Sequence, residues 1–187
     1  MEQFEAGTLA GAGSFRCETC DFAVALRERD PMPSCSNCGG QSFRRASMFG
    51  ETGTTPAPPT DLAKPEWLAE AREALMAEGD YLAFEQDDRV RVVPLQEGWT
   101  RIGRSLSAHV RLDDPTVSRR HALLYRADQE GAKILDDRSL NGVFRNGETI
   151  ELSTLGDGDV ISVGRFSIHF ISLTGDRSPR EQTVVSG

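Results

Sequence analysis

The sequence of 187 residues contains few of the features on which secreted or membrane-spanning proteins depend. No cysteine follows residue 38, and aromatic residues make up only 7% of the chain. No stretch approaches the roughly 20 consecutive apolar residues that a membrane-spanning helix needs. The first residues, MEQFEAGTLAG, have neither the basic start nor the apolar stretch of a secretion signal. We therefore expect a soluble, cytoplasmic protein.

The motifs of common enzyme classes are also missing. The sequence has no G-x-S-x-G turn for a nucleophilic serine and no G-x-x-x-x-G-K loop for nucleotide phosphates. It has only 3 histidines, and no cysteine beyond the first 38 residues that could pair with a base. We expect no catalytic activity.

Acidic residues outnumber basic ones by 29 to 21, which gives a formal net charge of -8. The excess is concentrated between residues 51 and 80, where 7 acidic residues accompany 2 basic ones. Nothing in this pattern resembles the basic stripe of a general nucleic-acid binder. The hydrophobic fraction of 38% suits one core of ordinary size and one smaller core.

All 4 cysteines fall in one short segment, as two C-x2-C pairs separated by a hairpin-length loop: Cys17, Cys20, Cys35 and Cys38. Such pairs present two sulfurs each on tight turns, which suits one tetrahedral zinc ion. Two disulfides are the alternative, but a disulfide within C-x2-C is strained and a reducing compartment opposes it. We predict a zinc ribbon over residues 1–49, with Gly39 and Gly40 permitting its turns and three phenylalanines shielding the metal: Phe15, Phe22 and Phe43.

The segment from Gly7 to Phe49 also resembles a family of small bacterial zinc-ribbon domains. Four thiolates close the coordination shell, so we expect the zinc to be structural rather than catalytic. Arg44 and Arg45 follow the second cysteine pair. They fit either a contact with nucleic acid or a solvated face.

Residues 50–64, GETGTTPAPPTDLAK, have almost nothing to bury and predict a flexible linker. Pro65 then opens a segment in which Leu68, Ala71 and Leu75 recur at helical spacing, with Gly79 as a C-terminal cap. We predict an amphipathic helix over residues 65–79 that packs on the following domain.

Residues 80–174 change to about ten short alternating runs separated by glycine, aspartate and asparagine. This pattern predicts a mainly β protein built around an antiparallel β-sandwich, followed by a tail over residues 175–187. Because sandwich strands are committed to the core, functional groups are expected in the end loops.

Three loops of the predicted sandwich carry polar residues suited to an oxyanion. The first contains Gly103-Arg104-Ser105, the second Ser118-Arg119-Arg120-His121, and the third Ser139-Leu140-Asn141-Gly142. A guanidinium with hydroxyl groups beside it is a good site for a phosphate group. Arg120 is expected to be a surface cation at the strand edge.

At these loops the chain, from Tyr81 to Leu173, resembles a forkhead-associated (FHA) domain, an eleven-stranded β-sandwich that binds phosphothreonine peptides. The resemblance implies that Arg104 and Ser118, with Ser105 and Arg119, hold the phosphopeptide, and that Asn141 bonds its backbone. It also implies that His121 braces the loops from within and that Gly103 and Gly142 permit their turns. Leu140 replaces the threonine that commonly precedes the N-G pair, which puts one hydroxyl contact in doubt.

From these features we predict a phosphothreonine-dependent protein-binding adaptor in bacterial Ser/Thr kinase signalling, with a phosphorylated protein and a Ser/Thr kinase as partners. The zinc ribbon would be structural or a second interaction module. The alternative is a ribbon that binds nucleic acid or the transcription machinery and is recruited through its FHA domain.

Three linker threonines raise a hypothesis of self-recognition: Thr52, Thr54 and Thr55. Once phosphorylated, one of them could enter the binding site of its own chain or of a second copy. An unmodified spacer is the alternative.

Overall fold

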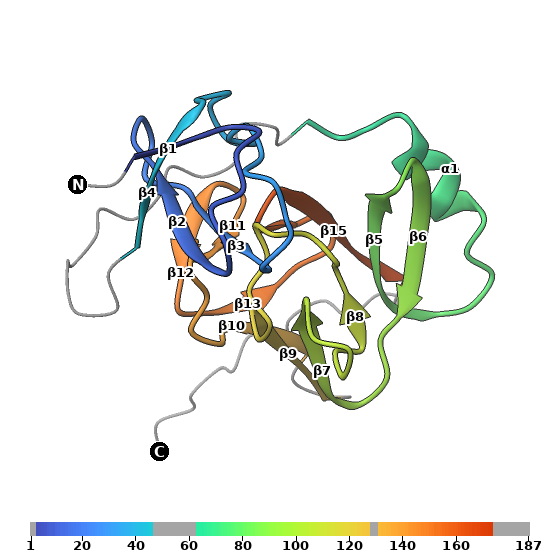
Figure 1. Cartoon of the computed structure of the whole chain (residues 1–187). Coiled ribbons are helices and arrows are strands. Elements are labelled where there is room, and N and C mark those ends of the chain that lie inside the picture. Colours follow the sequence, from blue (N-terminus) through green and yellow to red (C-terminus); the bar gives the residue numbers. More distant parts are fainter. Residues whose placement is uncertain (1–2, 47–62, 128–130, 174–187) are drawn as a thin grey trace, which may run out of the picture.

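The computed structural model describes residues 3–46, 63–127 and 131–173. It places a small sheet at the N-terminus, then one helix, then two larger sheets packed face to face (Figure 1). The predicted fold class, a mainly β protein with a β-sandwich behind a small N-terminal cysteine-rich module, is confirmed.

The small sheet has strand order β1-β4-β2-β3, with every neighbouring pair antiparallel. Its strands are β1 (Gln3–Glu5), β2 (Gly13–Cys17), β3 (Ala23–Leu26) and β4 (Ser42–Arg45). The three predicted shielding phenylalanines form the centre of its core, each no more than 1% exposed: Phe15, Phe22 and Phe43. This part of the chain, residues 3–46, is called the ribbon below.

The larger of the two sandwich sheets has strand order β12-β11-β14-β15-β5-β6 and is antiparallel throughout. Its strands are β5 (Gly79–Gln86), β6 (Arg89–Pro94), β11 (Val143–Arg145), β12 (Glu148–Ile150), β14 (Val160–Val163) and β15 (Phe166–Leu173).

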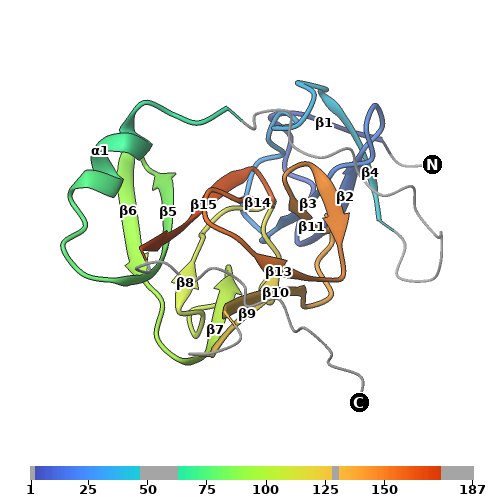
Figure 2. The same cartoon turned by 180° about the vertical axis from the view of Figure 1, so that it is seen from behind.

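The second sandwich sheet has strand order β13-β10-β9-β7-β8. Its strands are β7 (Gly98–Gly103), β8 (Val110–Arg111), β9 (Ala122–Ala127), β10 (Gly131–Asp136) and β13 (Leu152–Leu155). One pair departs from the antiparallel prediction, because the loop after β7 returns the chain so that β8 runs parallel to it. In the view from behind, β7, β9, β10 and β13 of this sheet lie below β14 and β15 of the larger sheet (Figure 2).

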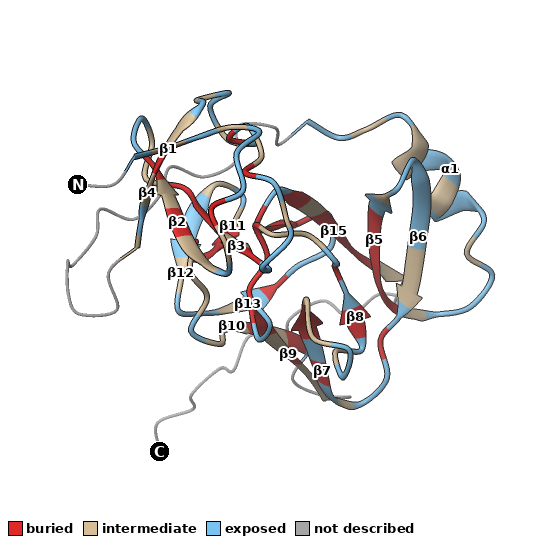
Figure 3. Ribbon diagram, viewed as in Figure 1, coloured by how far each residue is buried: buried red, intermediate tan, exposed pale blue. Residues whose placement is uncertain are grey.

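Both sheets contribute to one main core, as the alternating runs predict. Its centre consists of side chains that are at most 1% exposed: Leu82, Ile102, Leu124, Ile134, Ile161 and Ile168. Most strands of the sandwich carry buried residues, whereas α1 and the two edge strands β6 and β12 have none (Figure 3).

The helix α1 (Trp67–Glu73) is shorter than the predicted span of 65–79. Its apolar residues pack on the sandwich as expected, since Trp67 and Leu68 contact the cluster around Tyr81. Gly79 does not cap the helix but begins β5. The chain leaves the helix early because the residues after it are fastened to β5, where the Tyr81 hydroxyl donates to the Ala77 carbonyl at 2.9 Å.

Some predicted features fall outside the described residues. These are most of the 50–64 linker with its three threonines, Thr52, Thr54 and Thr55, and the tail over residues 175–187. The self-recognition hypothesis therefore stays a prediction. In the part of the chain that is described, no helix has the length and apolarity needed to span a bilayer.

Asp159 fixes the connections at one end of the sandwich. Its carboxylate accepts from the Arg145 guanidinium at 2.8 Å, from Asn146 at 2.7 Å and from the Gly156 N–H at 2.6 Å. Burial alone raises the pKa of Asp159, but these donors together lower it below its ordinary value. The charged form is therefore the one that the fold stabilises.

We predict that Asp159→Asn destabilises the protein by about 1 to 3 kcal/mol at neutral pH, because it removes charge-assisted hydrogen bonds. A lowered pKa in the folded state contributes stability that is present above the unfolded value, about 3.9, and is lost as pH falls through the folded value. Denaturant unfolding between pH 7 and pH 2.5 should show the difference between wild type and variant shrinking in that window. Asp88→Asn, at an exposed turn between β5 and β6, is the control, and equal stability of all three proteins would contradict the prediction.

Candidate functional site

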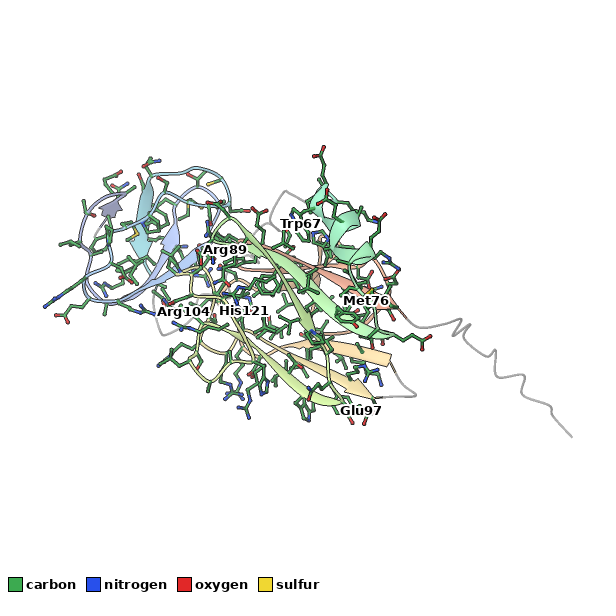
Figure 4. All side chains as sticks on the ribbon, turned by 90° about the vertical axis from the view of Figure 1, so that its right-hand side faces the viewer. Trp67, Met76, Arg89, Glu97, Arg104 and His121 are labelled. Carbon is green, nitrogen blue, oxygen red and sulfur yellow. The ribbon has the colours of Figure 1, made fainter. Side chains whose placement is uncertain are left out.

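The three loops predicted from the sequence meet at the end of the sandwich that faces the ribbon. The loop after β7 is bound to the loop before β9, because the N–H of Arg104 donates to the Ser118 carbonyl at 2.9 Å. The third loop joins them through the N–H of Asp137, which donates to the His121 carbonyl at 2.9 Å. Figure 4 shows Arg104 and His121 on the ribbon side of the sandwich, away from Trp67 and Met76 on the helix side.

His121 lies fully buried beneath the loops. Its Nδ1 accepts from the N–H of Ser118 at 3.0 Å, so its Nε2 carries the proton that is donated to the Gly142 carbonyl at 3.1 Å. Burial lowers the pKa of the imidazole below its ordinary value. The ring is therefore a neutral link between the second and third loops rather than a charge for a ligand.

The two glycines differ in what they allow. Gly142 has φ of +79°, a backbone conformation that side chains disfavour. Gly103 has no such angle; instead, a Cβ at this position would lie 2.5 Å from the Arg119 carbonyl oxygen. The implied turn at Gly103 is thus a close approach of two backbones.

Ser118 is only 9% exposed. Its Oγ accepts from the N–H of Leu140 at 3.0 Å, which leaves the hydroxyl hydrogen to donate elsewhere. Ser105 lies in the first loop, where its Oγ is 3.0 Å from the Ser107 Oγ. Both hydroxyl groups line one cavity with Arg104 and the exposed Arg119.

This cavity has a volume of about 1170 Å³ and lies between sandwich and ribbon, because Ser14 and Arg27 of the ribbon line its other side. Burial, followed by the nearby charge of Arg27, lowers the pKa of the Arg104 guanidinium. Several cations thus crowd around the space that the sequence predicts for a phosphate. An anion placed there would relieve their mutual repulsion.

Arg120 differs from Arg104 and Arg119 because its charge is paired within the protein. Its guanidinium forms a two-point ion pair with Asp137, at 2.8 Å for each bond, and its side chain is 75% exposed. Asp137 raises the pKa of Arg120. Of the two adjacent arginines, Arg120 is therefore already paired, as expected for a surface cation.

Asn141 is 1% exposed and holds the ribbon. Its Oδ1 accepts from the N–H of Ala23 at 2.7 Å, and its Nδ2 donates to the Ala23 carbonyl at 2.8 Å and to the Thr116 carbonyl at 2.9 Å. Arg104 also reaches the ribbon, donating from Nη1 to the Ala25 carbonyl at 2.8 Å. These contacts could not be predicted from the sequence, because Ala23 and Ala25 take part through their backbones alone.

The four cysteine sulfurs come together within 4.8 Å of one another. The Sγ atoms of Cys17 and Cys38 are 3.7 Å apart, and those of Cys20 and Cys35 are 3.6 Å apart. A tetrahedral zinc with Zn–S bonds of about 2.3 Å requires sulfur separations of about 3.8 Å. Burial raises the pKa of the Cys35 thiol, so a bound cation is what would favour its thiolate. Donor type and spacing both fit zinc.

The two metal-binding turns share one backbone design. In each, the residue after the second cysteine donates to the carbonyl of the first: Asp21 to Cys17 at 2.9 Å, and Gly39 to Cys35 at 2.8 Å. Both donors have positive φ, +61° and +75°. Glycine tolerates this angle, whereas Asp21 is held in it by ion pairs that involve Arg16 and Arg44.

Arg44 and Arg45 both have partners within the ribbon. Arg44 binds Asp21 at 2.7 Å. Arg45 lies over the Phe15 ring at 4.9 Å and donates to the Ala10 carbonyl at 3.0 Å. These contacts account for the arginine pair structurally, and they weaken the nucleic-acid interpretation.

Comparison with known protein families identifies both modules. Residues 100–164 match the model of the FHA domain, and residues 1–47 match that of a zinc-ribbon containing domain. Among curated proteins, the chain is 34% identical over 93 residues to the glycogen accumulation regulator GarA of Mycobacterium tuberculosis, covering 50% of this chain and 56% of that protein. It is 38% identical over 78 residues to the oxoglutarate dehydrogenase inhibitor of Corynebacterium jeikeium, covering 42% and 54%.

The chain thus spans about half the length of these curated relatives. Among solved structures, a domain from work on phosphothreonine-dependent FHA domain interactions is 36% identical, with a TM-score of 0.47 and coverage of 49% of this chain and 94% of that one. The family matches agree with the fold and with the cysteine cluster, and the chain therefore carries a forkhead-associated domain behind an N-terminal zinc-ribbon domain.

Proposed function

We propose that this chain is a non-catalytic adaptor that binds phosphothreonine-containing proteins in bacterial Ser/Thr kinase signalling. The observation that carries the proposal is the convergence of Arg104, Arg119, Ser105 and Ser118 on one cavity beside Asn141. These groups supply charge and hydrogen-bond donors on one side, which is what a phosphate ester requires. The names of two relatives, a regulator and an enzyme inhibitor, support a regulatory role.

In this proposal the switch lies in the ligand. A kinase adds a charge of about -2 to a threonine of the partner protein. Arg104 and Arg119 pair with that charge while Ser118 and Ser105 donate to phosphate oxygens, and Asn141 bonds the peptide backbone. Because His121 is neutral and fully buried, it fixes loop geometry and adds no charge. An unphosphorylated threonine offers no anion, so Arg104 and Arg119 cannot form these ion pairs with it.

We predict that Arg104→Ala and Arg119→Ala weaken binding of phosphothreonine peptides. A charge-assisted hydrogen bond contributes about 1.5 to 3 kcal/mol, so each loss should raise the Kd by about 10- to 100-fold. The probe is a peptide pool with a fixed phosphothreonine and randomised neighbours, measured by fluorescence anisotropy. Arg120→Ala is the matched control, since Asp137 already holds that guanidinium.

The same pool with threonine in place of phosphothreonine tests phosphate dependence. It should show no saturable binding. Equal binding of both pools by the wild type would refute the proposed function, as would an Arg120→Ala variant that lost as much affinity as Arg104→Ala.

For the ribbon we propose one structural zinc, held by the thiolates of Cys17, Cys20, Cys35 and Cys38. Native mass spectrometry should find one zinc per chain, and X-ray absorption should find four sulfur neighbours at about 2.3 Å. Cys38→Ser should lose zinc at lower chelator concentrations and show a less ordered ribbon, because metal binding and folding are coupled. Ser36→Ala, an exposed residue between the same cysteines, should behave like wild type. A zinc-free chain with two disulfides would contradict the proposal.

A further inference from the structure

Strand β3 is an edge strand of the ribbon sheet, whose order is β1-β4-β2-β3. In an antiparallel pair, alternate residues direct their N–H and C=O groups toward the partner strand and away from it. Phe22 bonds toward β2, since its carbonyl accepts from the N–H of Cys17 at 3.0 Å. Ala23 and Ala25 are therefore the residues whose backbone groups point outward from the sheet.

The sandwich binds all of these outward groups. Asn141 bonds both the N–H and the C=O of Ala23, at 2.7 and 2.8 Å. The N–H of Ala25 donates to the Pro115 carbonyl at 2.7 Å, and its C=O accepts from Arg104 at 2.8 Å. The Asn141 carboxamide and the loop groups thus hold the extended backbone of β3. Peptide-recognition sites hold an extended peptide in the same manner, through its main chain.

Two of these contacts use the side chains proposed above to hold a phosphopeptide. Asn141 is 1% exposed and already makes three hydrogen bonds, so it cannot bond a second extended backbone while Ala23 is in place. Arg104 gives one nitrogen to the ribbon, and its guanidinium has further donors. The backbone part of the site is occupied by the chain itself.

The phosphate part of the site is left open. The cavity of about 1170 Å³ reaches Ser105, Ser118 and Arg119, and none of these side chains has a bond to the ribbon among the described contacts. The strand, AVAL, carries no charged side chain. It therefore imitates the backbone of a bound phosphopeptide but supplies no phosphate.

We propose that β3 is a tethered, phosphate-free competitor for the peptide-binding site, so that a phosphorylated partner binds fully only by displacing the ribbon from Asn141 and Arg104. This inference rests on the phosphothreonine-binding function proposed above. An unphosphorylated peptide could only exchange backbone bonds for equivalent ones, whereas a phosphopeptide adds ion pairs in the open cavity. The competitor thus lowers the apparent affinity of both peptides by the same factor, so that only the peptide with the added ion pairs still binds, and displacement also frees the ribbon for a second contact.

The test uses the full chain with proline substitutions at the outward positions. Ala23→Pro and Ala25→Pro each remove an N–H that points away from β2, and edge strands tolerate proline on that side. If the ribbon is docked in about 90 to 99% of molecules, releasing it tightens binding of the phosphothreonine pool by about 10- to 100-fold. The unphosphorylated pool should still show no saturable binding, since it lacks the ion pairs in the open cavity.

Glu5→Pro is the matched control. It lies in β1, the opposite edge of the sheet, and the N–H of its neighbour Ala6 donates inward to the Gln41 carbonyl at 2.8 Å. By alternation the Glu5 N–H points away from β4. This variant should bind the phosphorylated pool as wild type does, and zinc content measured on all three variants shows whether the ribbon is intact.

A second measurement needs no variant. Amide hydrogen exchange at Ala23 and Ala25 should be slow in the free protein and should accelerate when the phosphothreonine pool saturates the site, with no change at Phe15 in the sheet interior. Phosphate-dependent binding without this acceleration, or weaker binding by Ala23→Pro, would show that the ribbon forms part of the site rather than competing for it. Absence of phosphate-dependent binding in every variant would instead overturn the proposed function, and this inference with it.

Discussion

The hydrogen bonds between the Asn141 carboxamide and the backbone of Ala23 join the two modules of this protein. A strand at the edge of a sheet has unpaired N–H and C=O groups that need partners. Here they find them in loops held by His121 and by the close approach at Gly103. Together with the bonds of the Ala25 backbone to Pro115 and Arg104 and the Arg27–Asp113 ion pair, this contact sets the orientation of the ribbon.

Charge is distributed around the cavity with a clear division of roles. Arg120 is balanced by Asp137, and Arg44 by Asp21, so neither contributes much field at the cavity. Arg104 keeps one bond to a neutral carbonyl, and Arg119 is exposed at the cavity wall. Arg104 and Arg119 thus place positive charge at one wall of the cavity, which suits a compact anion.

The sequence allowed the sandwich and the cysteine cluster to be predicted, because both depend on side chains. Alternating apolar residues mark strands whatever their neighbours are, and two C-x2-C pairs can present four sulfurs at one point. The early end of α1 could not be predicted, because it depends on Tyr81 reaching back to a carbonyl. The docking of β3 was equally hidden. Any extended segment could supply the backbone groups of Ala23 and Ala25, and no residue type marks the one that does.

The position of His121 has a consequence for the pH dependence of the site. The imidazole lies in the interior, and burial lowers its pKa below the ordinary value, so the neutral form is the one that the fold favours. The guanidinium groups at the cavity stay charged throughout this range. A phosphate monoester, by contrast, gains its second charge with a pKa of about 6. In the function proposed above, the protonation that modulates binding within the physiological range therefore belongs to the phosphate of the ligand rather than to His121.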